Sequence, residues 1–259
     1  MNAKRTVGFI GGGRAARILL GGFRNAGAEF AGVVVSEPET AAREKLRAVC
    51  PEASFGGIEE AASQDLVFLA VHPPVAAEAA GAARAALRSE AFLVSLAPKI
   101  TLARLGELLG GFERMARMIP NAPSLIGEGW NPIAFHPAAP EREKASLREL
   151  LAGLGECPET EEGRLEAYAM LTGMGPTYFW FQFRVLAELA EKFGLDPEKA
   201  APALERTACG AAKLFFSAGL SPEEVADLVP VKPLAPDEPA IAEAYRKRLP
   251  ALFEKIRPA

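Results

Sequence analysis

The first residues whose types and spacing suit chemistry form a glycine-rich turn near the start of the chain. The pattern G-x-G-x-x-A follows the apolar run TVGFI and comprises Gly11, Gly12, Gly13, Arg14, Ala15 and Ala16. In such a pattern the first glycine makes a tight turn, the second lets the backbone approach a pyrophosphate, and the small last residue packs the next helix against the strand. The amino terminus of that helix then faces the anion. The pattern predicts a dinucleotide-binding turn.

The end of the next apolar run bears on which dinucleotide binds. Ser36 and Glu37 follow the residues VVV there. Glu37 can accept hydrogen bonds from the ribose hydroxyls of NAD, whereas Ser36 and its backbone can bind the 2'-phosphate of NADP. No arginine is adjacent, but Arg14 in the glycine turn can reach a phosphate. These residues leave the choice between NAD and NADP open.

A glycine turn of this kind is held by a sheet, and the pattern of apolar runs in the first 160 residues is typical of one. Short apolar runs alternate with alanine-rich stretches, at 6–10, 30–35, 66–71, 92–96, 114–119 and 133–135. Such runs are typical of strands buried on both faces of a parallel sheet, and the stretches between them are long enough for crossover helices. The pattern predicts an α/β domain with a Rossmann-type doubly wound sheet. Two segments rich in proline and glycine, 69–75 and 117–132, predict loops after strands.

The composition changes near residue 162, after which strands are no longer predicted. Helices are expected over 164–192, with a break at 172–178, and over 197–217, 222–228 and 241–256. We therefore expect a dinucleotide-binding domain over 1–162 and an all-helical domain over 163–259. The stretch TYFWFQF, 177–183, is apolar on every side of a helix, so the helix needs cover on every side. A second subunit is the expected source of that cover, and a monomeric core is the alternative.

Composition excludes several classes of partner. The net charge is −4 with the two signs interspersed, which argues against nucleic acid as a partner. The longest apolar runs fall short of the roughly 20 residues that cross a bilayer, and no signal-peptide pattern is present. The three cysteines are scattered and form no CxxC pair, which favours a reducing cytoplasm and predicts no metal site. The expected partners are a small-molecule substrate and a further copy of the chain, in a homodimer or higher homo-oligomer.

Six segments in order resemble motifs of the pyrroline-5-carboxylate reductases, which reduce a cyclic imine to proline with NAD(P)H. VGFIGGGRAARILLGGF, DLVFLAVHPP, SLAPKITLARL and RMIPNAPSLIGEG resemble IGFIGGGNMAxAI, DxVxLAVKPQ, SIAAGITLxxL and RVMPNTPxxVGEG. LTGMGPTYFWFQFRVLAE and ERTACGAAKLFFSAGLSPEEVADLV resemble LSGSGPAYxxxxxEAL and QTVxGAAxLLxxSGxxPxxLxDxV. The resemblance covers roughly 6–229. It implies a helical dimerisation domain, proline biosynthesis and NADP as the cofactor, with NAD as the alternative.

The resemblance also implies roles for individual residues. The positions implied for the pyrophosphate are Gly11, Gly13, Ala15 and Ala16, and Ser36 would lie by the adenosine ribose. The positions implied for the nicotinamide side are Ala70, Val71, His72, Pro73 and Ala97, and Asn121 would form the floor of the active-site loop. His72 stands where the family has lysine, which removes a fixed positive charge. It either acts near the cofactor or is a loop histidine without chemistry.

The chain departs from the family where the substrate is expected to bind. The family's loop SPGGTT offers small hydroxyls and glycine amides to the substrate carboxylate, but residues 230–239 here are PVKPLAPDEP. Prolines remove amide donors, so the backbone cannot rebuild the same anion site. Met174 also replaces a serine of the family motif. Lys232 either supplies a point charge to an acidic substrate or is a solvated loop residue, so the substrate is pyrroline-5-carboxylate or a related cyclic imine.

Few residues are candidates for proton transfer. An iminium substrate is already an electrophile and needs little acid–base help, whereas a ketone would need a proton donor. The candidate donors are Thr172, Tyr178, Lys232 and His72. The alternative function is a non-catalytic NAD(P)-binding dimer that has lost the substrate loop. A 3-hydroxyacid dehydrogenase is disfavoured because the long helix lacks that family's lysine, and a deazaflavin-dependent reductase because of the helical half.

Overall fold

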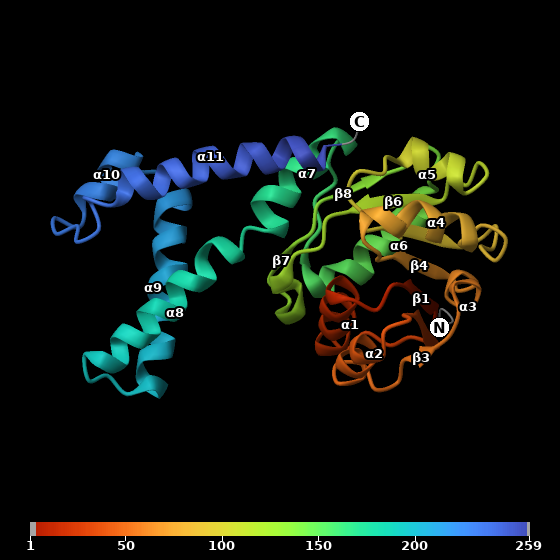
Figure 1. Ribbon diagram of the computed structural model, residues 1–259, viewed down its shortest axis with the longest axis horizontal. Helices are drawn as coiled ribbons and strands as arrows, with labels where there is room; N and C mark the ends of the chain where they lie inside the picture. Colours follow the sequence, from red (N-terminus) through yellow and green to blue (C-terminus); the bar gives the residue numbers. More distant parts are fainter. Residues whose placement is uncertain (1–3, 258–259) are drawn as a thin grey trace. The chain divides into compact units, whose positions relative to one another are not determined.

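The computed structural model describes residues 4–257, apart from the side chains of Pro73 and Pro74 (Figure 1). The chain divides into two compact units. The first comprises Met1–Met174 with Phe253–Ala259, and the second comprises Gly175–Leu252. The α/β elements belong to the first unit, and α8 (Thr177–Lys192), α9 (Pro197–Ser217) and α10 (Pro222–Asp227) belong to the second.

The first unit is built on a seven-stranded sheet with the order β3-β2-β1-β4-β5-β6-β8. Its strands are β1 (Thr6–Ile10), β2 (Gly32–Ser36), β3 (Ser54–Phe55), β4 (Leu66–Leu69), β5 (Phe92–Ser95), β6 (Met115–Met118) and β8 (Ile133–Phe135). All neighbours are parallel except β6 and β8. A separate small pair joins β7 (Gly129–Trp130) to β9 (Gly155–Glu156). The strand order reverses at β1, which lies between β2 and β4.

Helices cover both faces of this sheet, as the alternation of β4 shows. Leu66 and Phe68 belong to a buried cluster with α1 (Arg14–Asn25), α2 (Thr40–Arg47) and α6 (Glu141–Leu151). Val67 and Leu69 belong to a second cluster with α3 (Ile58–Ala62), α4 (Pro73–Ala83) and α5 (Leu102–Leu108). Successive strand residues point to opposite faces. The predicted doubly wound fold is therefore confirmed.

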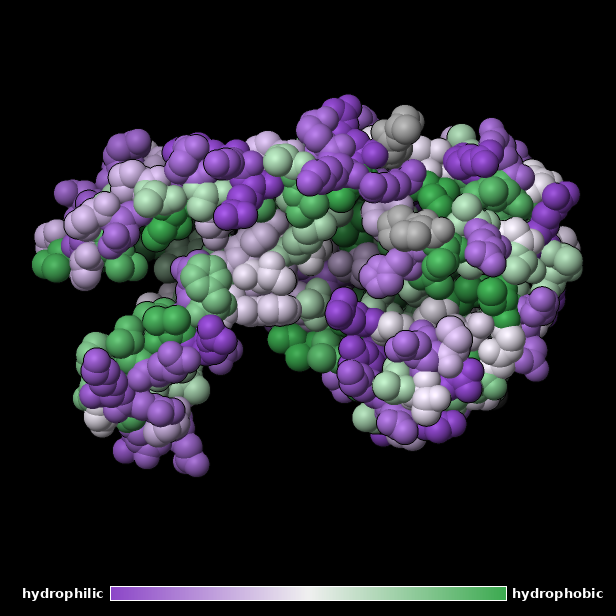
Figure 2. Space-filling view, in the orientation of Figure 1, coloured by the Kyte–Doolittle hydropathy of each residue, from purple (hydrophilic) through white to green (hydrophobic). Residues whose placement is uncertain are grey.

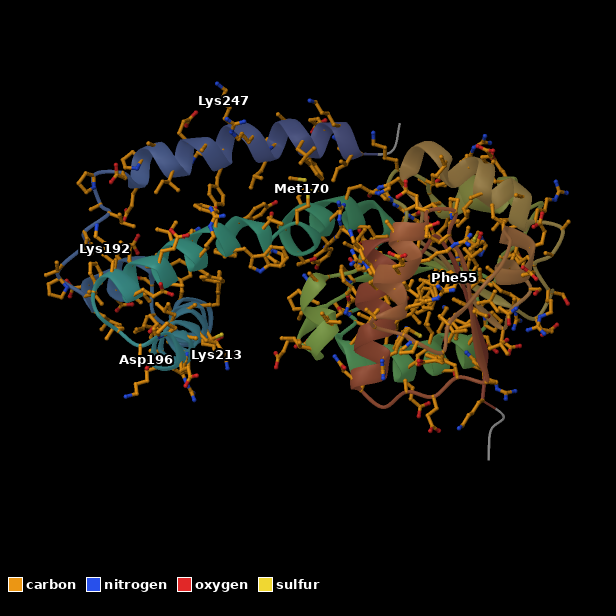
Figure 3. The ribbon with its side chains drawn as sticks, turned by 60° about the horizontal axis from the view of Figure 1, so that its bottom comes forward. Phe55, Met170, Lys192, Asp196, Lys213 and Lys247 are labelled. Carbon is orange, nitrogen blue, oxygen red and sulfur yellow. The ribbon has the colours of Figure 1, made fainter. Side chains whose placement is uncertain are left out.

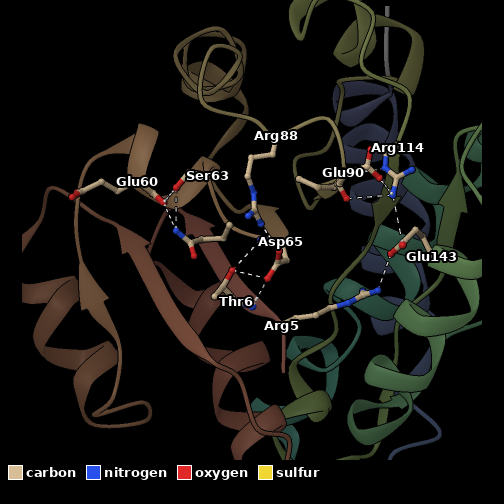
Figure 4. Close-up of polar contacts among 11 residues, drawn as sticks. Arg5, Thr6, Glu60, Ser63, Asp65, Arg88, Glu90, Arg114 and Glu143 are labelled. Carbon is tan, nitrogen blue, oxygen red and sulfur yellow. Dashed lines mark hydrogen bonds and ion pairs between the residues drawn. The ribbon is translucent and has the colours of Figure 1, made fainter. Parts of the chain in front are cut away.

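Polar contacts fix the edge of the sheet where the parallel strands begin (Figure 4). The carboxylate of Asp65, just before β4, accepts hydrogen bonds from the backbone N and Oγ1 of Thr6 at 2.8 and 2.9 Å. Glu143 of α6 pairs with Arg5 at 2.8 Å and with Arg114 at 3.6 Å. The loops that follow the parallel strands lie at the opposite edge, where these strands end.

The prediction of a loop over residues 69–75 is wrong in part, because α4 begins at Pro73. Proline suits the first turn of a helix, where its missing N–H would have had no partner and its φ is already helical. The second predicted loop, 117–132, contains a short 3-10 helix, η1 (Ala122–Ile126), and β7. Two further 3-10 turns are η2 (Ala152–Leu154) and η3 (Glu162–Arg164).

The helical part starts with α7 (Leu165–Tyr168) and continues as a π-helical turn, η4 (Ala169–Gly173). After the break come α8 (Thr177–Lys192), α9 (Pro197–Ser217), α10 (Pro222–Asp227) and α11 (Glu238–Ile256). Figure 3 labels Met170 on the π-helical turn, and Lys192 and Asp196 near the junction of α8 and α9. The predicted break within 172–178 is therefore present, at residues 174–176, and Gly175 and Pro176 lie in it.

The helical unit leaves much apolar surface uncovered. Among the described residues of Gly175–Leu252, only Gly175, Ala190 and Ala200 are buried. Large apolar side chains on α8 and α9 are exposed, including Trp180 at 54% and Phe216 at 82%. Figure 2 shows hydrophobic patches on the surface of these helices. A single chain therefore does not supply the cover that the aromatic stretch of α8 needs.

Candidate functional site

The glycine turn lies between the ends of β2 and β4. The backbone N of Gly11 donates to the carbonyl of Ser36 at 2.8 Å, which ties the turn to β2. Gly11 has φ +103°, and a Cβ there would lie 2.7 Å from the carbonyl oxygen of Ala70. Only glycine satisfies both the backbone conformation and the close approach. The turn is thus fixed beside β1, where the strand order reverses and α/β proteins bind their ligands.

Gly12 and Gly13 differ in what surrounds them. The backbone N of Gly12 donates to Oε2 of Glu37 at 2.9 Å, and a Cβ on Gly12 would lie 2.8 Å from the Cβ of Glu37. Gly13 has an ordinary φ of −72° and is the N-cap of α1. A Cβ on Gly13 would meet nothing within 4 Å, so it would enter open space. This space at the amino terminus of a helix fits a dinucleotide pyrophosphate.

A cavity of about 620 Å³ opens in front of the turn. It brings together most of the predicted cofactor-binding residues, namely Gly11, Gly13, Arg14, Ala15, Ser36, Glu37, Ala70, Val71 and His72. Gly12 and Ala16 are buried and are not among its lining residues. His72 is the exposed N-cap of α4. These residues, from separate segments of the sequence, thus surround one cavity.

Two further predicted binding residues, Ala97 and Asn121, do not line the cavity. Pro73 is the first residue of α4, and its side chain is outside the described part of the chain. Ala97 is 2% exposed. Asn121 is buried elsewhere in the first unit, where its Nδ2 donates to the backbone carbonyl of Thr172 at 2.5 Å and its Oδ1 accepts from the backbone N of Trp130 at 3.3 Å. Asn121 therefore anchors the π-helical turn to the loop after β6.

One wall of the cavity was not predicted from the sequence. Val75, Glu78, Ala79 and Ala82 of α4 line it. Their spacing of three, four and seven residues places them on one helix face. The pattern is present in the sequence, but an alanine-rich helix shows too little contrast between its faces to reveal it. The other lining residues that the sequence analysis missed are Ile10, Pro38, Ile58, Leu96 and Pro98.

The three predicted catalytic residues lie outside this cavity. Thr172, in the first unit, donates from Oγ1 to the carbonyl of Tyr168 at 2.9 Å. Tyr178, in the second unit, packs edge-to-face against Tyr245 with their ring centroids 5.8 Å apart. Burial and then the neighbouring Tyr245 raise the pKa of Tyr178 above its usual value. Lys232, also in the second unit, is exposed between α10 and α11. The lining of the cavity thus contains cofactor-binding candidates but none of these three.

No helix among residues 4–257 combines the length and the apolar character that crossing a bilayer requires. Two family models match the chain. Residues 6–99 match the model described as "NADP oxidoreductase coenzyme F420-dependent". Residues 162–254 match "Pyrroline-5-carboxylate reductase dimerisation". The first match covers the glycine turn and most of the cavity lining, and the second covers the helices with exposed apolar surface.

Relatives and solved structures agree with these matches. The chain is 31% identical to pyrroline-5-carboxylate reductase 3 of Bos taurus, over 85% of this chain and 72% of that one. It is 29% identical to the pyrroline-5-carboxylate reductase of Pseudomonas aeruginosa, over 96% and 92% of the two chains. The Plasmodium falciparum pyrroline carboxylate reductase with NADP bound has the same fold, with a TM-score of 0.80 at 20% identity over 98% and 97% of the two chains.

The expectations of a Rossmann-type sheet, a helical dimerisation domain and an NAD(P)-dependent oxidoreductase are confirmed by these findings. The helical domain also disfavours a purely deazaflavin-dependent reductase, although the model that matches the first part bears that name. By its motifs, its cavity and its similarity to these reductases, the chain belongs to the pyrroline-5-carboxylate reductase family.

Proposed function

We propose that this protein uses NAD(P)H to reduce the C=N bond of a small cyclic imine, pyrroline-5-carboxylate or a close relative. The observation that carries the proposal is the cavity at the glycine turn, where five separate stretches of the sequence converge. Reductases of this name are similar to the chain over nearly its whole length. Because residues 230–239 and Met174 differ from the family motifs, the proposed substrates include related cyclic imines.

The residues around the cavity suit the parts of a dinucleotide. The amino terminus of α1 and the gap at Gly13 would hold the pyrophosphate, with Arg14 beside it. Ser36 and Glu37 would face the adenosine ribose, and Ala70, Val71 and His72 would lie toward the nicotinamide. The aliphatic face of α4 would form an apolar wall. A bound nicotinamide supplies the hydride, so the protein has to orient the imine carbon and exclude water.

The proton candidates remain Thr172, Tyr178 and Lys232. The hydroxyl of Tyr178 is protonated at neutral pH, as a proton donor requires, although its raised pKa makes it a weaker acid. The hydroxyl of Thr172 also carries a proton, although it donates to the carbonyl of Tyr168. Lys232 is exposed and would offer a positive charge to a carboxylate.

We further propose a homodimer or higher homo-oligomer that forms through a helical domain starting at residue 163, in the cytoplasm. The exposed apolar residues of α8 and α9 support the first part, and the free thiols of all three cysteines suit a reducing compartment. Sedimentation of the intact chain tests the assembly. A species with the mass of one chain at micromolar concentration would rule it out.

The activity is tested by following NADH and NADPH oxidation with pyrroline-5-carboxylate and with five- and six-membered cyclic imino acids. Turnover of any of them supports the proposal, and the best substrate defines the ring size. A protein that binds the cofactor tightly but oxidises it with none of these imines would instead be the non-catalytic dinucleotide-binding protein.

A further inference from the structure

The carboxylate of Glu37 is held in a defined position at the end of β2. Its Oε2 accepts from the backbone N of Gly12 at 2.9 Å, and its Oε1 accepts from the backbone N of Glu39 at 2.9 Å. The side chain is half-buried and lines the cavity. Both oxygens are thus fixed by backbone groups and not by a mobile partner.

This arrangement leaves the carboxylate able to accept more hydrogen bonds. An ionised carboxylate has about four acceptor positions, and the two backbone donors use two of them. The free positions suit the two hydroxyls of an adenosine ribose, because each hydroxyl has one proton to donate. A 2'-phosphate has no such proton at the ribose oxygen, and it brings negative charge toward the carboxylate.

The charges around Glu37 do not neutralise it. Within the part of the chain that the structure describes, its carboxylate forms no ion pair, and the guanidinium of Arg43 donates to its backbone carbonyl. Arg14 is the arginine that lines the cavity, and it lies at the glycine turn, where the pyrophosphate charges would compete for it. Glu78 adds a second carboxylate to the lining, and His72 completes its ionisable groups.

We propose that Glu37 makes this enzyme selective for NADH over NADPH, by accepting the ribose hydroxyls of NADH and repelling the 2'-phosphate of NADPH. The inference deepens the proposed function, since it requires a dinucleotide in this cavity. It reverses the preference for NADP that the family resemblance implies. Like charges placed together without a counter-ion cost several kcal/mol, so the expected preference in Kd is about 30-fold or more.

The test measures the Kd of NADH and of NADPH for the intact protein by titration calorimetry, with no imine present. The wild-type protein is expected to bind NADH more tightly by the factor above. Glu37→Gln keeps the size of the side chain and one acceptor oxygen but removes the charge, and it is expected to reduce the preference at least about fivefold by tightening NADPH binding. Glu39→Gln is the matched control. It removes the same charge two positions along the chain, but the side chain of Glu39 is exposed and does not line the cavity.

The measured Kd values separate a failure of this inference from a failure of the proposed function. Equal or tighter NADPH binding by the wild-type protein overturns the inference while leaving the proposed function intact, and this measurement needs no variant. Binding of neither dinucleotide overturns the proposed function. An equal change in Glu37→Gln and Glu39→Gln would show a general effect of net charge and would also overturn the role of Glu37.

Discussion

The guanidinium of Arg117 and the carboxylate of Glu166 form a buried ion pair that joins β6 to α7. Nη2 of Arg117 lies 2.5 Å from Oε1 of Glu166, and both side chains are 2% exposed. Arg117 also donates from Nη1 to Glu162 at 2.9 Å, and Glu162 in turn accepts from the backbone N of Leu102. The first turns of the helical segment are therefore tied to the sheet through one arginine.

Removing Glu166 takes the fully buried counter-charge away from Arg117 and leaves it only the partly exposed Glu162. Glu166→Ala is therefore expected to lower the free energy of unfolding by about 3–5 kcal/mol, as measured by urea denaturation. Glu107→Ala, which breaks the exposed pair with Arg104, is the control and should cost less than about 1 kcal/mol. A loss in Glu166→Ala as small as in the control would contradict the importance of the pair. The double variant Arg117→Met with Glu166→Leu should recover most of the loss.

Much of the sheet could be predicted from the sequence, whereas this pair could not. Strands β1 and β8 and helix α9 have the predicted bounds, because strong apolar runs or clear caps define them. β3 was missed because two residues carry no periodic pattern. Arg117 and Glu166 lie 49 positions apart, and nothing in the local sequence marks either as buried.

The same contrast holds for the candidate site. The glycine turn and Glu37 could be predicted because their spacing reflects what a dinucleotide requires of the backbone. The placement of Asn121 on the carbonyl of Thr172 could not, since it depends on how a π-helical turn packs on a loop. The positions of Tyr178 and Lys232 relative to any substrate depend on neighbours that local sequence does not encode.

Gly13→Ala is expected to separate cofactor binding from stability. The φ of Gly13 suits any residue and the added Cβ meets nothing within 4 Å, so the Tm should stay close to that of the wild-type protein. The methyl group would enter the space proposed for the pyrophosphate and weaken NADH binding about tenfold or more. Gly32→Ala, also free of contacts within 4 Å but outside the cavity lining, should bind normally. Unchanged NADH affinity in Gly13→Ala would place the cofactor elsewhere.

Lys99 adopts φ +71°, in the left-handed region that glycine favours. It follows β5, at the position where the family motif SIAAGIT has glycine. The strain of a Cβ there outweighs the extra freedom that glycine gives the unfolded chain, so Lys99→Gly should stabilise the protein by about 0.5–1 kcal/mol in urea denaturation. Lys99→Ala removes the same charge but keeps the Cβ. A gain of the same size in Lys99→Ala would show that charge, and not backbone strain, is responsible.

The buried thiols predict a loss of stability in alkali. Burial raises the pKa of Cys157 to about 12 and that of Cys50 to about 11, from an ordinary value of 9.0. Because the unfolded chain releases these protons from about pH 9 and the folded chain does not, the stability is full below pH 9 and falls as the pH rises toward 12. The urea midpoint should therefore drop between about pH 8 and pH 10.

Thiol labelling checks the same prediction at constant pH. In Cys209→Ser, which lacks the exposed cysteine, both remaining thiols should react with a disulfide reagent at least about 100-fold more slowly in the native protein than in denaturant. A thiol that reacts rapidly in the native variant would show that Cys50 or Cys157 is accessible as thiolate.

In the proposed reaction, hydride passes from a nicotinamide held at the glycine turn to the C=N carbon of a cyclic imine. The most direct measurement supplies NADH with deuterium at its transferable position, together with pyrroline-5-carboxylate, and analyses the proline by mass spectrometry. We expect monodeuterated proline in an amount equal to the NADH consumed, and the same yield of label with the best related imine. Absence of deuterium from every product, in a protein that binds NADH, would contradict it.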